Sequence, residues 1–314
     1  MRKSTILVAT WGDGLIVLSG DARHQELPGQ AVKALAPDRH GSALAIVGGR
    51  ALCRRTPEGK WNTIATTGFP LACSVAVGDV IYVGTDDAHV LRVSADGQIE
   101  TLRGFEVVPG RETWYAGSAL INGQLVGPPL GVRSMTATSD GATLLANVHV
   151  GGIPRSTDGG VTWQPTIDVD SDVHEVCAHP IQPSIVIAAT AMGLCISRDG
   201  GATWTIEQQG LHAPYCSAVA FSGNDILVAA SADHFATQGA IYRRPIDGES
   251  PLDPVGCGLP RWIDGIADTG CIAARESSVA VADKGGNLYA SVDAGRTWSH
   301  HANGLPAISS VLVF

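Results

Sequence analysis

The sequence predicts an all-β fold, and three observations support that class. An octapeptide with the pattern Ser-x-Asp-x-Gly-x-Thr-Trp occurs three times, at residues 156–163, 197–204 and 291–298. Seven apolar runs of strand-forming residues recur, mostly about 40 residues apart. The chain starts with a run that elsewhere comes second in a unit and ends, at residues 308–314, with one that comes first. We therefore predict a seven-bladed β-propeller, a single domain over residues 1–314, in which the C-terminal strand pairs into the N-terminal blade and closes the ring.

Each octapeptide is expected to form a tight turn between two strands. Its Asp accepts hydrogen bonds from backbone N–H groups across the turn, and its glycines supply the positive φ that the turn needs. The closing Trp returns to bury its ring against the neighbouring unit. We therefore assign a folding role, and no catalytic one, to Asp158, Trp163, Asp199, Trp204, Asp293 and Trp298.

Weaker copies of the turn complete the series, at residues 19–21, 56–61, 94–97 and 246–248. A near-continuous apolar run precedes each turn, as expected for strands buried on both faces. These second strands are predicted at residues 6–10, 44–48, 81–85, 144–148, 185–189, 226–230 and 279–283.

The net charge, the apolar segments and the cysteines exclude several classes of function. The net charge of −9 argues against a nucleic-acid partner, and no Lys/Arg run suggests a membrane surface. The apolar run at residues 6–9 is too short for a signal peptide or a membrane span, so we expect a cytoplasmic protein. The seven cysteines show no metal-binding spacing and are expected to be reduced.

One interval between turns is longer than the rest by about 20 residues, and the surplus lies in residues 103–130. This insertion contains Trp114 and Tyr115, a possible hairpin at Asn122-Gly123, and a Gly-Pro-Pro segment at residues 127–129. It joins the third blade to the fourth, on the face expected to lie opposite the octapeptide turns. We interpret it as a lid or binding loop; the alternative is a structural plug.

Three positions in each blade are expected to surround the mouth of the central channel. The first column, on the innermost strands, is Ser309, Lys33, Cys73, Arg133, His174, Cys216 and Ile263. The next is Ser310, Ala34, Ser74, Ser134, Glu175, Ser217 and Asp264. The third, just after the second strands, is Trp11, Gly49, Asp86, His149, Thr190, Ser231 and Lys284.

Ionisable and aromatic groups that converge on a concave surface are typical of a small-molecule site. The candidate acid–base residues are His149, His174, Glu175 and Asp264. The candidate substrate-binding residues are Trp11, Lys33, Asp86, Trp114, Tyr115, Arg133, His234, Trp262 and Lys284. A divalent metal held by His149 and His174 with Glu175 or His234 is the alternative, but no ligand spacing supports it, so no cofactor is predicted.

The octapeptide resembles the Asp-box, or BNR repeat, of sialidase-like β-propellers. In that family the box lies between the third and fourth strands of a blade, on the face away from the ligand. The resemblance implies the fold and not sialidase activity, because the family's Phe/Tyr-Arg-Ile-Pro segment is absent. Nothing brings Arg50, Arg133 and Arg261 together with Tyr115 or Tyr215 as a sialidase site would require. The blade count is similar to BNR propellers related to photosystem assembly factors, which bind proteins through a basic patch that this acidic chain lacks.

Two hypotheses follow. The first is an enzyme acting on a small molecule at the channel mouth, by hydrolysis or another acid–base step under the inserted loop. The second is a non-catalytic propeller that recruits another protein, in which the polar channel is merely filled with water.

Overall fold

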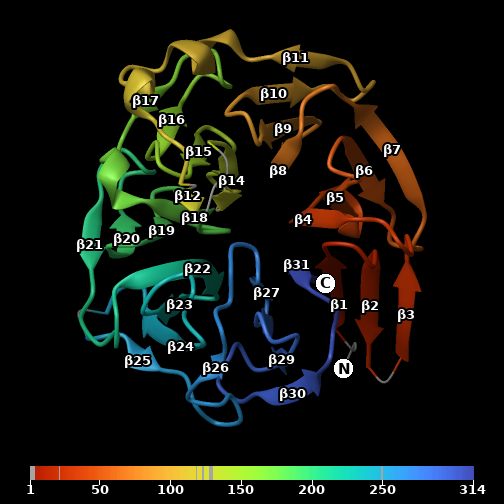
Figure 1. Cartoon of the computed structure of the whole chain (residues 1–314), viewed down its shortest axis with the longest axis vertical. Helices are drawn as coiled ribbons and strands as arrows, with labels where there is room; N and C mark the ends of the chain where they lie inside the picture. Colours follow the sequence, from red (N-terminus) through yellow and green to blue (C-terminus); the bar gives the residue numbers. More distant parts are fainter. Residues whose placement is uncertain (1–3, 21, 118, 122–123, 127–129, 249) are drawn as a thin grey trace. The chain divides into compact units, whose positions relative to one another are not determined.

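The computed structural model describes residues 4–20, 22–117, 119–121, 124–126, 130–248 and 250–314. These residues form seven sheets of four or five strands and one two-stranded hairpin, which confirms the predicted all-β, seven-bladed β-propeller (Figure 1). No helix among the described residues is long and apolar enough to cross a membrane. Helical structure there is confined to short 3₁₀ segments: η1 (Arg39–Gly41), η2 (Arg103–Val107), η3 (Arg111–Thr113) and η4 (Val169–Ser171).

The chain divides into two compact units. The terminal unit comprises Met1–Leu35, Ala191–Leu194 and Glu207–Phe314, and the central unit comprises Ala36–Thr190 and Cys195–Ile206.

The terminal unit contains three complete sheets. The first runs in the order β3 (Ala22–Glu26), β2 (Leu15–Ser19), β1 (Thr5–Thr10) and β31 (Ile308–Val313). The sixth runs β22 (Tyr215–Ser222), β23 (Asp225–Ser231), β24 (Gln238–Pro245) and β25 (Asp253–Pro254), with β26 (Ile263–Asp264) also paired to β24. The seventh runs β27 (Ile272–Arg275), β28 (Ser278–Ala282), β29 (Leu288–Ser291) and β30 (Ser299–Ala302).

Most strands of the other four sheets belong to the central unit. The second sheet is β4 (Val32–Pro37), β5 (Ala43–Val47), β6 (Ala51–Arg55) and β7 (Trp61–Thr66). The third is β8 (Leu71–Val77), β9 (Val80–Thr85), β10 (Val90–Val93) and β11 (Ile99–Thr101). The fourth is β14 (Val132–Ala137), β15 (Leu144–Val148), β16 (Pro154–Ser156) and β17 (Gln164–Pro165). The fifth is β18 (Val173–Ala178), β19 (Val186–Thr190), β20 (Gly193–Ser197) and β21 (Thr205–Glu207).

The predicted second strands are buried as their apolar sequences require. Every residue of β5, β15 and β19 is buried, because each strand lies between two others and both of its faces are covered. By contrast, β3 at the edge of the first sheet is mostly exposed. In the central unit β14 packs against both β8 and β18, so the first strands of neighbouring sheets adjoin one another.

The C-terminal strand completes the first sheet. β31 is antiparallel to β1, with Ile6 opposite Val313 and Val8 opposite Val311. Phe314 N donates to Thr5 O at 2.9 Å, and the C-terminal end lies beside β1 in Figure 1. The predicted pairing of the last strand with the N-terminal blade is therefore confirmed.

Five of the first strands carry a β-bulge near the start of the sheet pairing. In β18, Val173 lies opposite Thr190 and Glu175 opposite Ala189, so His174 is an extra residue without a cross-strand counterpart. Arg133 holds the same position in β14. A bulge re-aims the side chain of the extra residue, and bulges are frequent beside functional sites. The extra residues in the other three strands are Ala72, Ser217 and Ser309.

The bulges correct the predicted columns. The expected first column contained Cys73 and Cys216, but the residues equivalent to His174 are Ala72 and Ser217, because an extra residue shifts the side-chain alternation by one. The seventh sheet differs more. Its first strand is β27, whereas Ile263 and Asp264, expected there, form β26 and extend the sixth sheet.

The three octapeptides share one hydrogen-bond pattern. The Oδ1 atoms of Asp158, Asp199 and Asp293 accept from the backbone N of the Thr four residues later, at 2.9, 2.9 and 2.8 Å. The rings of Trp163 and Trp298 are buried and donate to a turn carbonyl. Trp204 is only partly buried, and its Nε1 donates to Thr166 Oγ1 at 3.1 Å instead.

We expect Asp199→Asn to lower the free energy of unfolding at pH 7 by about 1 kcal/mol, the usual value of a side chain that caps backbone N–H groups. Burial raises the pKa of Asp199, but hydrogen bonds from Thr203, Ser197 and Ala202 outweigh it and lower the pKa from 3.8 to about 2. Because the folded pKa is depressed, the contribution is complete above about pH 4 and disappears as the pH falls toward 2.

Chemical denaturation of both proteins at pH 7, 4 and 2.5 measures this difference, with the exposed Asp170→Asn as the matched control. A gap between wild type and Asp199→Asn that stays constant down to pH 2.5 contradicts the assignment.

Candidate functional site

Three side chains of the central unit converge on one point: His149, Asp172 and His174. His149 Nε2 lies 3.3 Å from Asp172 Oδ1, and His174 Nε2 lies 3.6 Å from Asp172 Oδ2. The two imidazole rings are tilted by 37° with their centroids 5.7 Å apart. The carboxylate therefore sits against both imidazoles, in an arrangement that we call the His–Asp–His cluster.

Local backbone features place each member of the cluster. His149 directly follows β15, where the strand ends, and His174 is the bulged residue of β18. Asp172 ends η4 with a left-handed backbone, φ 48°, and its N donates to Val169 O. A non-glycine residue in this region is uncommon, although Asp tolerates it better than most. The reversal at Asp172 turns its carboxylate toward the histidine two residues later.

The cluster has one solvent-facing member. The side chain of Asp172 is 33% exposed, whereas those of His149 and His174 are 8% and 1% exposed. A molecule arriving from solvent meets the carboxylate first, and the imidazoles lie behind it.

The electrostatics of the cluster favour an ionised Asp172. Burial raises its pKa, but the hydrogen bond from His174 and the positive charges of His174, His149 and Arg133 outweigh burial and hold the pKa below its usual range. Arg133, the bulged residue of the neighbouring strand, thus acts on the same carboxylate. The carboxylate of the cluster thus interacts with three groups able to carry positive charge: the two imidazoles of the cluster and Arg133.

The second part of the insertion covers His149. Tyr115 N donates to Val150 O at 3.1 Å, which fixes the insertion beside the residue after His149. Gly117 lies directly on the imidazole, because a Cβ atom at this position would stand 2.1 Å from His149 Cε1. Any larger residue at this position would displace the ring. β12 (Ala119–Ile121) and β13 (Gln124–Val126) form a hairpin, with Ile121 opposite Gln124.

Asn122, Gly123 and residues 127–129 lie outside the described residues, so the structure does not describe the expected turn itself or the Gly-Pro-Pro segment.

The first part of the insertion does not lie where the sequence placed it. Phe105 packs edge-on against Trp163 of the first octapeptide, with centroids 5.1 Å apart, so η2 adjoins a turn instead of the opposite face. Glu106 accepts from His89 Nδ1 at 2.6 Å, and Arg111 Nη2 donates to Ala88 O at 2.8 Å. These contacts anchor residues 103–113 to the third blade.

Two predicted substrate-binding aromatics of the insertion differ in exposure. Trp114 is buried, packs 5.7 Å from Phe105 and stacks under the Arg111 guanidinium at 4.8 Å. Tyr115 is 52% exposed. Trp114 therefore serves the core of the insertion, and Tyr115 is the aromatic side chain that solvent reaches.

The remaining predicted residues of the central unit lie near their expected strand ends. Glu175 is partly buried in β18 opposite Ala189. Asp86 follows β9, and its N donates to Pro70 O at 2.8 Å.

The terminal unit holds the other predicted site residues. Lys33 Nζ lies 6.0 Å from the ring centre of Trp11. The Arg261 guanidinium stacks on Trp262 at 4.5 Å, and the ring of His234 contacts Phe235. Asp264 N donates to Asp283 Oδ2 at 3.1 Å, and Asn287 Nδ2 donates to Asp264 Oδ2 at 3.1 Å. Lys284 N donates to Ile266 O at 3.0 Å. The carboxylate of Asp264 is thus engaged in an Asp–Asn network of its own unit.

Sequence reasoning missed Asp172. It precedes its strand by one residue, whereas the columns were drawn only from strand residues and from the residues directly after second strands. The available signal was an acidic residue two positions before His174 at the start of an apolar strand.

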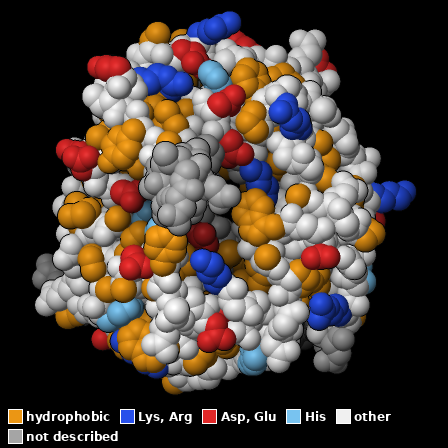
Figure 2. All heavy atoms as spheres, viewed as in Figure 1, with side chains coloured by type: hydrophobic (Ala, Val, Ile, Leu, Met, Phe, Trp, Pro, Cys, Tyr) orange, Lys and Arg blue, Asp and Glu red, His pale blue; other side chains and the backbone are white. Residues whose placement is uncertain are grey.

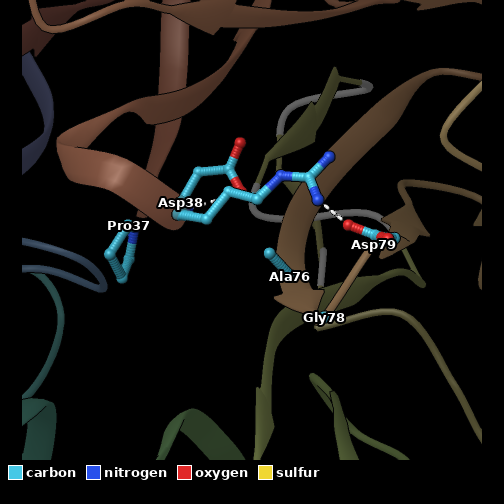
Figure 3. A pocket seen from close by; sticks show the side chains of 6 residues that line it. Pro37, Asp38, Ala76, Gly78 and Asp79 are labelled. Carbon is cyan, nitrogen blue, oxygen red and sulfur yellow. Dashed lines mark hydrogen bonds and ion pairs between the residues drawn. The ribbon is translucent and has the colours of Figure 1, made fainter.

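A separate cavity of about 330 Å³ opens beside β4 and β8, lined by Pro37, Asp38, Arg39, Ala76, Gly78 and Asp79 (Figure 3). Arg39 pairs with Asp79, and Arg54 Nε lies 2.5 Å from Asp38 Oδ2. Its charged groups neutralise one another, so we assign this cavity no chemistry. Acidic and basic side chains are likewise interspersed on the face shown in Figure 2.

No protein-family model matches this chain. No curated protein matches it either. Solved structures do. A proposed 6-phosphogluconolactonase from Bacteroides uniformis is 13% identical with a TM-score of 0.68, covering 100% of both chains. YCF48 from Cyanidioschyzon merolae is 15% identical with a TM-score of 0.58, covering 90% of this chain and 94% of that one.

The GH74 enzyme of Niastella koreensis is 12% identical with a TM-score of 0.61, covering 94% of this chain. This chain spans only 46% of that enzyme's length. At such identities the likeness shows the propeller fold alone.

Proposed function

We propose that this chain is an enzyme that carries out a hydrolytic or related acid–base step on a small molecule at the His–Asp–His cluster. The observation that supports it is the position of Asp172: a partly exposed carboxylate backed by two buried imidazoles and kept ionised by them and by Arg133. Such groupings of interacting ionisable side chains concentrate at functional sites.

The proposed step is the hydrolysis of an ester or lactone. Asp172 takes a proton from a water molecule while the water oxygen bonds to the carbonyl carbon. When the tetrahedral intermediate collapses, the bond to the leaving oxygen breaks and that oxygen receives the proton from Asp172. His149 and His174 are positioning residues that orient the carboxylate, and Arg133 stabilises the negative charge on the carbonyl oxygen.

The positive charge of Arg133 favours a substrate that carries a carboxylate or phosphate group. The name of one similar structure, a proposed lactonase, suggests lactones as the first substrates to test. Tyr115, exposed beside the cluster, is the aromatic surface on which such a substrate would pack.

We expect Asp172→Asn to lower kcat/KM by about 10²- to 10⁴-fold, the usual worth of a general acid or base. The assay is turnover of a panel of lactones, esters and glycosides by the purified chain. Asp170→Asn is the matched control, because Asp170 is exposed and lies two residues away. Equal turnover by Asp172→Asn and wild type would remove the cluster from the mechanism.

His174→Gln tests the positioning role with a readout that mere loss of packing does not move. If the imidazoles hold the carboxylate ionised, the acidic limb of the kcat/KM profile shifts to higher pH in this variant, because Asp172 loses a group that lowers its pKa. An unchanged limb together with lower stability would assign His174 a structural role only.

A non-catalytic, protein-binding propeller is the second candidate. Val107 of η2 and Val161 of the first octapeptide are 76% and 68% exposed. They lie on segments in contact, because a Cβ at Gly104 would stand 1.9 Å from Val161 O. Exposed apolar side chains on adjoining segments favour a protein partner. This candidate would be supported if a protein that co-purifies with the wild-type chain is lost from the Val107→Asp and Val161→Asp variants. The wild-type chain should then also show no turnover of any substrate in the panel.

A further inference from the structure

We infer that His149, Asp172 and His174 form a binding site for one divalent transition-metal ion of the Zn²⁺ and Mn²⁺ class. This inference concerns the same site as the proposed function and deepens it. It rests on the proposed function in one respect only, namely that a water molecule bound to the metal would take part in the acid–base step. Ion binding itself follows from the geometry and chemistry of three side chains.

The spacing of the ligand atoms fits one ion. Imidazole nitrogen and carboxylate oxygen bind Zn²⁺ at about 2.0–2.2 Å, so tetrahedral ligands around it stand roughly 3.4 Å apart. The two nitrogen–oxygen separations in the cluster are 3.3 and 3.6 Å. One ligand atom from each of the three residues lies within 4.8 Å of the others. An ion can therefore enter once these side chains draw together by up to about 1.4 Å, the difference between that limit and the tetrahedral spacing.

The donor set selects the kind of ion. Two imidazole nitrogens and one carboxylate oxygen suit Zn²⁺, Mn²⁺, Fe²⁺ or Co²⁺, whereas Mg²⁺ and Ca²⁺ prefer oxygen ligands throughout. Three protein ligands leave at least one coordination position for water, as in catalytic sites. That position faces solvent past Asp172, the one member of the cluster with substantial exposure.

The surroundings hold the imidazoles in place. The backbone at Gly117 lies on the His149 ring, and the bulge in β18 fixes the direction of His174. Such support orients metal ligands and keeps their affinity high. Arg133 acts against the ion, because it is the bulged residue of β14, which packs against β18, and it carries a positive charge. We therefore expect Arg133→Gln to bind the metal more tightly than wild type.

The ion would give the proposed acid–base step its water. A divalent metal lowers the pKa of a bound water toward neutrality, and Zn²⁺ brings it to about 7. Asp172 would then contribute as a ligand, with the acid–base group being the water beside it.

The test uses the full chain after chelator treatment and dialysis. Titration with Co²⁺, followed by its visible absorption, and calorimetric titration with Zn²⁺ and Mn²⁺ should each show one site per chain. His149→Gln, Asp172→Asn and His174→Gln should each weaken binding by 10-fold or more. His301→Gln, at an exposed histidine of β30, should bind as wild type does. All proteins carry Cys257→Ser, because Cys257 is the one exposed cysteine among the described residues.

Gly117→Ala extends the test beyond the ligands themselves. The added Cβ would stand 2.1 Å from His149 Cε1 and 2.2 Å from its Nδ1, so the ring must move. We expect weaker metal binding and an altered Co²⁺ spectrum, although all three ligands remain. Thermal unfolding of each apoprotein shows which variants are folded and comparable.

Four outcomes decide the inference. Absence of binding of all three ions at 0.1 mM, or binding that persists in the triple variant of the three ligands, would overturn it. Turnover that survives chelation in a metal-free protein would overturn the catalytic role of the metal-bound water and leave the proposed enzyme intact. Stoichiometric binding at the three ligands without turnover of any substrate would uphold the metal site and count against the proposed function.

Discussion

Truncation after Ala307, which removes β31, is expected to abolish cooperative folding of the chain. β31 supplies one of the four strands of the first sheet, and Val311, Leu312 and Val313 are buried. Without it, β1 exposes an apolar edge with unpaired N–H and C=O groups, which favours aggregation. β1 pairs with β2 on its other edge, so no other strand in the described part of the first sheet can replace β31.

Far-UV circular dichroism, thermal unfolding and size-exclusion chromatography of the truncated chain measure the effect. Val311→Ala is the milder companion: it keeps the strand and should cost about 1–3 kcal/mol, as expected for partial truncation of a buried aliphatic side chain. A synthetic peptide of residues 308–314 added in trans should restore part of the native signal. A truncated chain that melts cooperatively at the wild-type temperature would show that β31 is dispensable.

Trp163→Ala is expected to lower the free energy of unfolding by about 3–5 kcal/mol, the range for a buried Trp replaced by Ala. Its ring is 2% exposed, packs on Phe105 and donates from Nε1 to Gly160 O at 2.9 Å. Removal leaves a cavity between the first octapeptide and η2. Because η2 anchors the insertion, we also expect reduced hydrogen-exchange protection in residues 103–117.

Trp204→Ala is the matched control, since Trp204 closes the second octapeptide but is only partly buried. It should cost clearly less, roughly 1–2 kcal/mol, by its smaller buried area. Urea denaturation of both variants gives the comparison. Equal losses would mean that the octapeptide itself, and not its contact with the insertion, determines the contribution of the Trp.

The fold could be predicted from two strong signals in the sequence, the repeated octapeptide and the apolar runs. Apolar runs such as residues 44–48 and 144–148 became β5 and β15, because a strand covered on both faces must be apolar along its whole length. The seventh sheet was misassigned, since β26 and β27 lie only eight residues apart and both start with Ile. Nothing in composition tells which of two short apolar segments pairs with β28.

The candidate site was predicted in part. His149 and His174 were placed at neighbouring strand ends, and the structure brings them together. Asp172 was missed because its contact depends on a left-handed backbone, which the sequence does not reveal for a residue other than glycine. Asp264 was grouped with these two histidines because it was expected in the first strand of the seventh sheet. It lies instead in β26, which pairs with β24 of the sixth sheet. Cys73 and Cys216 were each placed one residue away from the position equivalent to His174. The reason is a β-bulge in each strand, which the pattern of apolar residues does not reveal.

The β-bulges affect which amino-acid substitutions the first strands can accept. His174 and Arg133 have no counterpart on the adjoining strand, so a replacement of similar size leaves every ladder hydrogen bond in place. The strand pairing therefore does not restrict which residue occupies either position. A lineage built on this scaffold can exchange the bulged residues one sheet at a time while the architecture persists.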